Sequence, residues 1–167
     1  AEGRVEKCAA RIIVNAGGPW VATVRQTLVG AAGDGRVRLV QGSHIVMPRL
    51  YAGTHAYLLQ QPDGRIVFAI PFEEDFTLVG TTEVPLQAPS PDPTVAPGEI
   101  EYLCPAVNRC FREAVLPEQR VWSFAGIRAL FDDGQSDPSA VTREYRLEVD
   151  GARSEPPLLS VYGGKLT

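Results

Sequence analysis

An Asp-Gly pair at residues 63–64 most constrains the fold, because it lies between two short apolar runs. The first run covers residues 56–60 and the second covers residues 65–70. This arrangement is typical of a β-hairpin. A third run, residues 76–80, follows the acidic turn of residues 73–75. Three short strands joined by short turns predict an antiparallel meander and not a βαβ unit.

The other segments alternate between strand and helix patterns. Residues 10–16 form an apolar run that we interpret as a buried strand, and a helix is expected from Pro19 to its closure at Gly30. A second helix is expected over residues 100–111, where Pro105 predicts a kink or a late start. Further strands are expected in residues 36–51, 121–131, 143–149 and 158–162. We therefore predict an α+β fold, with one antiparallel or mixed sheet of about seven strands flanked by two helices.

Composition narrows the classes of function. The chain has 167 residues, 44% of them hydrophobic, and a net charge of -4, with no dense block of basic residues. Nucleic acid is therefore not an expected partner. Three cysteines without metal-ligand spacing favour a reducing compartment and no metal site. No apolar run is long enough to span a membrane, and the charged N-terminus does not resemble a signal peptide.

Three segments share one pattern, in which an apolar strand meets glycine and then a side chain that can carry positive charge. They are Gly42–His44, Gly126–Arg128 and Gly163–Lys165. Glycine lets a ligand approach the backbone, so the three side chains could line a pocket for a small anion. Histidine would exchange a proton there, arginine would bind an oxyanion with two hydrogen bonds, and lysine would neutralise a phosphate. A strand kink with a structural histidine, an ordinary strand arginine and a solvated lysine remain alternatives.

Two other short segments have a local interpretation. The Gly17-Gly18 pair before a helix could bring backbone N–H groups to an anion, although most such turns are only tight turns. Residues 81–83, Thr-Thr-Glu, are polar and predict a solvated strand end.

Several longer stretches resemble the FAD-dependent glycerol-3-phosphate dehydrogenases, and they occur in the same order from Ala10 to Thr167. The related glycerol-3-phosphate oxidases share this scaffold and remain an alternative. The stretches that carry the resemblance are residues 13–20, 38–51, 65–72, 76–83, 126–130 and 158–167.

The resemblance implies a reaction and a set of site residues. Glycerol 3-phosphate would lose a hydride to the flavin and a proton to a base, giving dihydroxyacetone phosphate, with electrons passing to a quinone. His44 matches a substrate-pocket histidine and is the expected proton acceptor, while Arg128 matches an arginine near the flavin and substrate, and Lys165 a lysine on the substrate phosphate. The matched cofactor-binding residues are Gly17, Gly18, Gly126, Arg128, Gly163, Gly164, Lys165, Leu166 and Thr167.

The resemblance also implies an architecture. Residues 36–150 would be the substrate-binding cap of a glutathione-reductase-like or D-amino-acid-oxidase-like FAD oxidoreductase, and residues 1–35 and 151–167 would belong to its flavin domain. No Gly-x-Gly-x-x-Gly occurs, so the dinucleotide-binding unit of the same protein would be the missing partner of these 167 residues. We expect a fragment that neither retains FAD nor turns over substrate alone. The whole protein would be cytoplasmic, peripheral at the inner face of the cell membrane, and a homodimer is compatible with it.

The chain departs from the family pattern at four positions. Gly17 replaces a threonine, Glu83 replaces an aspartate, Ala129 replaces a proline, and Pro105 lies within an expected helix. Two other classes remain open: a related flavin amine or hydroxy-acid oxidase, whose pocket would clamp a carboxylate, and a non-enzymatic domain that binds an anion or a partner.

Overall fold

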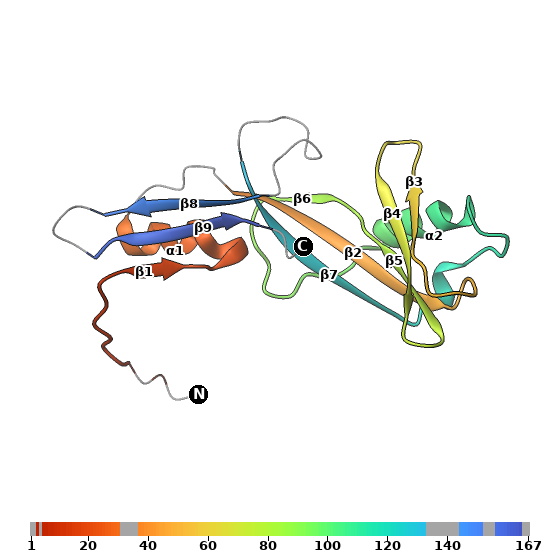
Figure 1. Ribbon diagram of the computed structural model, residues 1–167, viewed down its shortest axis with the longest axis horizontal. Helices are drawn as coiled ribbons and strands as arrows, with labels where there is room; N and C mark the ends of the chain where they lie inside the picture. Colours follow the sequence, from red (N-terminus) through yellow and green to blue (C-terminus); the bar gives the residue numbers. More distant parts are fainter. Residues whose placement is uncertain (1–2, 4, 31–36, 133–143, 152–155, 165–167) are drawn as a thin grey trace. The chain divides into compact units, whose positions relative to one another are not determined.

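The computed structural model describes residues 3, 5–30, 37–132, 144–151 and 156–164. Within these residues the chain divides into two compact units, one made of Ala1–Arg38 with Ala129–Thr167 and the other of Leu39–Arg128. The described residues form nine strands, two α-helices and two short 3₁₀ helices (Figure 1). The sequence led us to expect one sheet of about seven strands, and this is wrong, because the strands form two sheets.

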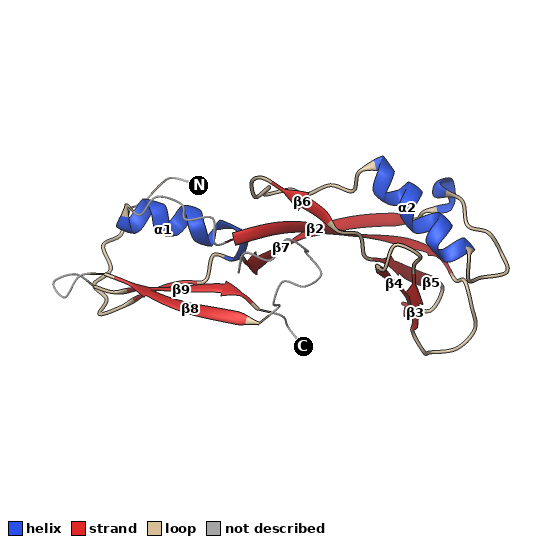
Figure 2. Ribbon diagram, turned by 90° about the horizontal axis from the view of Figure 1, so that it is seen from above, coloured by secondary structure: helices blue, strands red, loops and turns tan. Residues whose placement is uncertain are grey.

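The first unit contains a three-stranded sheet with one helix along it (Figure 2). The central strand pairs in parallel with one neighbour and antiparallel with the other, in the order β1-β9-β8. A 3₁₀ turn precedes the helix, which ends at Gly30 in the left-handed conformation that glycine adopts readily. The elements are β1 (Ile13–Asn15), η1 (Gly18–Trp20), α1 (Val21–Val29), β8 (Tyr145–Asp150) and β9 (Leu158–Gly163).

The core of the first unit is small. Its buried cluster consists of Val21, Phe131 and Tyr162, with Val37 packed against it. Arg25 on α1 makes a two-pronged ion pair with Asp150 at the end of β8, at 2.7 Å for both hydrogen bonds. The strand predicted in residues 10–16 is present as β1, but its predicted burial is wrong, because Ile13 and Val14 are exposed.

The second unit contains the predicted meander. Its sheet has the order β3-β4-β5-β2-β6, and β7 pairs with β2. The long strand β2 is therefore central, and it runs antiparallel to β5 and β6. The elements are β2 (Val37–Pro48), β3 (Tyr57–Gln60), β4 (Ile66–Phe72), β5 (Phe76–Gly80), β6 (Val84–Leu86), α2 (Pro97–Asn108), η2 (Pro117–Gln119) and β7 (Trp122–Phe131). The first two residues of β2 and the last three of β7 belong to the first unit.

Helix α2 forms the main core of the second unit with the sheet. Its buried residues Ile100, Leu103 and Val107 pack with Ile45 and Val79 from β2 and β5. The helix begins at Pro97 and continues through Pro105. Of the two effects predicted for Pro105, the late start is therefore wrong, and the kink stays a prediction. Neither helix that the structure describes is both long and apolar enough to cross a bilayer.

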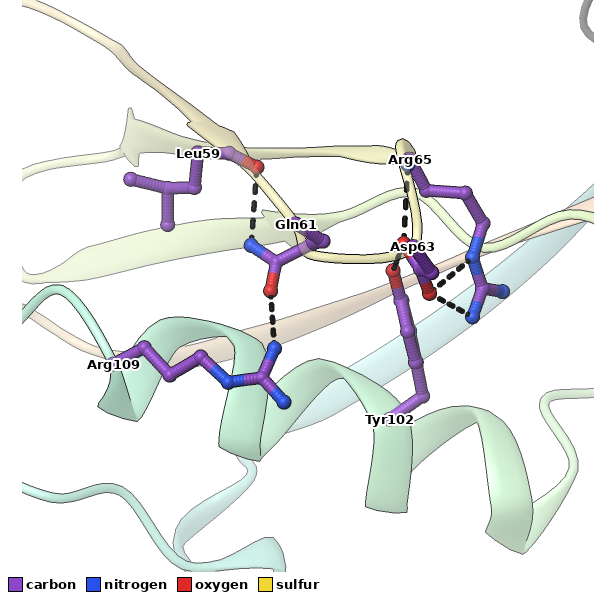
Figure 3. A network of polar contacts seen from close by, with 6 residues as sticks. All are labelled: Leu59, Gln61, Asp63, Arg65, Tyr102 and Arg109. Atoms are coloured by element: carbon purple, nitrogen blue, oxygen red, sulfur yellow. Dashed lines mark hydrogen bonds and ion pairs between the residues drawn. The ribbon is translucent and has the colours of Figure 1, made fainter.

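Polar contacts fix the β3–β4 hairpin to α2 (Figure 3). Gln61 accepts a hydrogen bond from Arg109 at 2.7 Å and donates to the Leu59 carbonyl. At the tip, Arg65 pairs with Asp63 and its guanidinium lies 3.8 Å from the centre of the Tyr102 ring. The hydrogen bonds from Arg65 hold the pKa of the exposed Asp63 carboxyl below its usual value. The hairpin predicted from the Asp-Gly pair is confirmed, with Gly64 at φ +83.

Candidate functional site

His44 lies in the middle of the unbroken strand β2, so the glycine before it does not interrupt the strand. In the pairing register, His44 is opposite Gly80 of β5, and its ring covers the space where a side chain at Gly80 would stand. The ring also stacks on Phe124 of β7, with ring centroids 5.1 Å apart and planes 8° from parallel. The Nδ1 atom is buried and has no hydrogen-bond partner within the described residues.

The side chain of Arg128 lies over Gly42. Gly42 belongs to β2 and precedes His44 by two residues. A Cβ at Gly42 would be 2.5 Å from Nη2 of Arg128 and 2.6 Å from Oγ1 of Thr81. Gly42 is therefore required for the approach of an arginine from the same unit. Nη2 donates a hydrogen bond to Oγ1 of Thr81 at 2.9 Å, and Nη1 is 3.8 Å from Oε1 of Glu83.

Burial and the charge of Arg128 both lower the pKa of His44 from its model-compound value of 6.5, burial being the larger cause. A histidine with a lowered pKa is neutral at pH 7 and can accept a proton. The structure therefore brings together two of the three cation-capable side chains of the sequence pattern, although they come from strands far apart in the sequence. Their roles in binding and catalysis stay predictions.

The third such side chain, Lys165, lies outside the described residues, as do Leu166 and Thr167. The preceding glycines are described, and both have left-handed backbones, Gly163 at φ +64 and Gly164 at φ +97. A Cβ at Gly163 would be 2.8 Å from the carbonyl oxygen of Glu144, so the end of β9 requires glycine on packing grounds alone.

The Gly17-Gly18 turn of the first unit is held by Asn15, whose side chain is buried. Its amide donates to the Val21 carbonyl at 2.8 Å, and its Oδ1 atom accepts from the backbone N–H of Gly17 at 3.3 Å. Gly18 has φ +53, and a Cβ there would meet nothing within 4 Å. The position of Gly126 in β7 is equally open. No contact of a cofactor with these glycines follows from the geometry alone.

Sequence reasoning missed the residues that support His44 and Arg128. Thr81 and Glu83 contact Arg128, and Thr82 is 2% exposed, so the prediction of a solvated strand end is wrong. Phe124 was not singled out as a neighbour of His44. The sequence feature that could have indicated these residues is the polar triplet of residues 81–83, directly after Gly80. Its contact partners lie in other elements, so the sequence alone did not identify them.

Comparison with known proteins gives the class to which this arrangement belongs. All 167 residues match the family described as FAD dependent oxidoreductase, DAO. The chain therefore belongs to the DAO family of FAD-dependent oxidoreductases.

Individual relatives are more specific. A glycerol-3-phosphate dehydrogenase of Pseudomonas aeruginosa is 45% identical over 167 residues, which is 100% of this chain and 33% of the relative. A D-erythritol 1-phosphate dehydrogenase of Brucella abortus is 44% identical over 165 residues, which is 99% of this chain and 33% of the relative. The X-ray structure of the glycerol-3-phosphate dehydrogenase from Bacillus halodurans, complexed with FAD, is similar at a TM-score of 0.69 and 30% identity, covering 94% of this chain and 29% of that one.

The chain thus spans about a third of the length of the curated relatives that it matches. The described residues of this chain form two sheets and two α-helices, and their structural similarity to the FAD-bound dehydrogenase supports the predicted α+β fold class.

Proposed function

We propose that these 167 residues are the substrate-binding cap, with flanking flavin-domain segments, of an enzyme that oxidises sn-glycerol 3-phosphate to dihydroxyacetone phosphate. One observation carries the proposal: a neutral, half-buried histidine and an arginine lie together in a chain 45% identical to a glycerol-3-phosphate dehydrogenase. The division into a cap at residues 36–150 and flavin-domain segments at 1–35 and 151–167 is part of this proposal. The proposal also includes the type of cap, which would be that of a glutathione-reductase-like or D-amino-acid-oxidase-like FAD oxidoreductase.

The residues of the second unit fit a bound group such as FAD beside His44. The buried Nδ1 of His44 lacks a partner within the described part of the chain, and the backbone at Gly126 has open space beside it. In the first unit, taken by itself, the backbone at Gly18 is open as well. The residues that would hold the cofactor are the glycines at 17, 18, 126, 163 and 164 with Arg128, followed by Lys165, Leu166 and Thr167. When bound, FAD would supply the acceptor for the two electrons that leave the substrate carbon.

His44 would accept the proton of the substrate hydroxyl. Burial and Arg128 keep its imidazole neutral, so a lone pair is available near neutral pH. Arg128, held by Thr81 and Glu83, would hydrogen-bond the substrate oxygens and stabilise negative charge that develops on the oxidised oxygen. Lys165 would neutralise the phosphate. Electrons would then leave to a quinone from a cytoplasmic protein at the inner face of the membrane.

A second substrate is favoured by one observation: a D-erythritol 1-phosphate dehydrogenase is 44% identical to this chain, against 45% for the glycerol-3-phosphate enzyme. Both substrates combine a phosphate with a polyol, and the same histidine, arginine and lysine would serve either one. An oxidase that reduces oxygen is the alternative for the acceptor.

The test uses the full-length protein that contains this chain, reconstituted with FAD. Dye-linked oxidation of glycerol 3-phosphate and D-erythritol 1-phosphate identifies the substrate, and peroxide formation identifies an oxidase. Replacing His44→Gln should lower kcat by about 10²- to 10⁴-fold, the usual contribution of a general base. His55→Gln removes the other histidine of the chain, which is exposed, and should leave kcat unchanged.

The pH profile checks the same assignment. Because the pKa of His44 lies below 6.5, kcat/KM should be level near pH 7 and fall only as the pH drops through that lowered value. The His44→Gln enzyme should lose this acidic limb. A wild-type protein inactive on both phosphates, or a His44→Gln enzyme with normal kcat, would contradict the proposal.

A further inference from the structure

A buried carboxylate lies on the opposite face of the sheet from His44. Glu99, in the first turn of α2, is 6% exposed. Its Oε1 accepts a hydrogen bond from the Thr82 hydroxyl at 2.5 Å, and its Oε2 accepts from the Ala96 backbone N–H at 2.9 Å and from the Gln41 amide at 3.0 Å. A buried charge is tolerated only with partners of this kind.

The charge state of Glu99 follows from these partners. Burial alone would raise its pKa, but hydrogen bonds from Thr82, Ala96, Ser43 and Gln41 outweigh burial, so the pKa is lowered. The position near the N-terminus of α2 favours negative charge as well. Glu99 is therefore ionised near neutral pH and can only accept hydrogen bonds. This fixes the direction of each bond that reaches it.

The Thr82 hydroxyl links Glu99 to the strand of the candidate site. Because this hydroxyl donates its proton to Glu99, its oxygen is free to accept the backbone N–H of Ser43, at 2.9 Å. Ser43 lies between Gly42 and His44 on β2, and side chains alternate along a strand. The bond that fixes Ser43 from the helix side therefore also fixes the two neighbours that face the other way.

The same hydroxyl fixes the segment that holds Arg128. Thr82 lies between Thr81 and Glu83, the two residues that contact the Arg128 guanidinium. One carboxylate and one hydroxyl thus connect α2 to the segment that carries His44 and to the segment that orients Arg128. Both buried residues belong to the same unit as the site they support.

We propose that Glu99 and Thr82 are positioning residues, which set the placement of His44 and Arg128 from behind the sheet and touch neither substrate nor cofactor. This proposal rests on the proposed function for its consequence in catalysis. The structural claim, that these two residues set the position of the His44 ring, does not depend on which substrate the enzyme takes.

The test compares two variants. Thr82→Val keeps the shape of the side chain but removes its hydroxyl, whereas Thr82→Ser keeps the hydroxyl. In the full-length FAD-loaded enzyme, Thr82→Val should lower kcat by roughly 10- to 100-fold with little change in KM, because an error of about 1 Å in a reacting group costs this much. Thr82→Ser should restore most of the rate. Normal kcat in Thr82→Val, or equal losses in both variants, would overturn the proposal.

Rates are expressed per bound flavin, and the melting temperature is recorded, so that a loss of folded enzyme is not counted as a loss of catalysis. A rate loss in Thr82→Val that disappears on this correction would also overturn the proposal. If the wild type oxidises neither phosphate, the proposed function fails, and crystal structures still decide the positioning. The His44 ring of Thr82→Val should be displaced from Phe124 relative to Thr82→Ser; superposable rings would refute the assignment.

Discussion

The two units bury apolar surface to different extents. In the second unit, a cluster from β2 to β5 and α2 leaves Leu103, Ile45 and Val79 almost without exposure. Among the described residues of the first unit, the buried cluster consists of Val21, Phe131 and Tyr162. The second unit therefore has a larger core than the described part of the first.

The exposed face of the first sheet explains the difference. Tyr145, Leu147 and Val149 of β8 are 69%, 53% and 67% exposed. In the pairing register, Leu147 is opposite Val161 and Val149 is opposite Leu159, so these apolar residues share one face. Proteins rarely expose a contiguous apolar face. We expect further polypeptide to cover it in the intact protein, in accord with relatives about three times as long.

The largest expected effect is the difference in stability loss when a buried leucine is truncated in each of the two cores. Leu103→Ala should lower the free energy of unfolding of the second unit by about 2–5 kcal/mol, and Leu158→Ala in the first unit by about 2 kcal/mol or less, because the thinner unit can relax around the cavity. Each unit holds one tryptophan, Trp20 in the first and Trp122 in the second, so fluorescence of Trp20→Phe and Trp122→Phe backgrounds reports denaturant unfolding of each unit separately. Equal losses at the two leucines would contradict the comparison.

The sequence predicted local backbone structure better than it predicted which side chains are buried or exposed. The Asp-Gly hairpin, the meander and the end of α1 at Gly30 depend on neighbouring residues, and the structure confirms them. The burial of Thr82 depends on Glu99 in another element, and the exposure of Tyr145, Leu147 and Val149 in β8 depends on which elements pack against that strand. Neither can be deduced from a single sequence with local rules.

The candidate site shows the same limit. The sequence singled out His44 and Arg128 by a shared glycine pattern, but spacing alone could not show that they converge. Convergence depends on the pairing of β2 with β5 and β7, which sets Gly80 opposite His44 and allows Arg128 to lie on Gly42. The structure explains Gly42 by its contact with the Arg128 and Thr81 side chains, whereas the sequence pattern had suggested the approach of a ligand.

A smaller effect is expected from the ion pair that holds α1 in the first unit. Arg25→Met removes two 2.7 Å hydrogen bonds to Asp150, so the free energy of unfolding should fall by about 1.5–3 kcal/mol. Arg146→Met in the same unit is the control; this arginine is mostly exposed and should cost no more than about 1 kcal/mol. The Trp20 fluorescence transition measures both. Equal costs would mean that the bidentate pair gives this unit no particular stability.

The smallest effect is expected on the exposed apolar face. Leu147→Lys should change the free energy of unfolding of the 167-residue chain by no more than about 0.5 kcal/mol, as surface substitutions usually do. It should reduce binding of an uncharged apolar dye such as Nile red, because it places a charge on the exposed apolar face. In the full-length protein the same change should be strongly destabilising, since it would bury an unpaired ammonium against the covering polypeptide. Similar small effects in both proteins would show that the face stays in water, and the contrast between a complete and an incomplete unit would then fail.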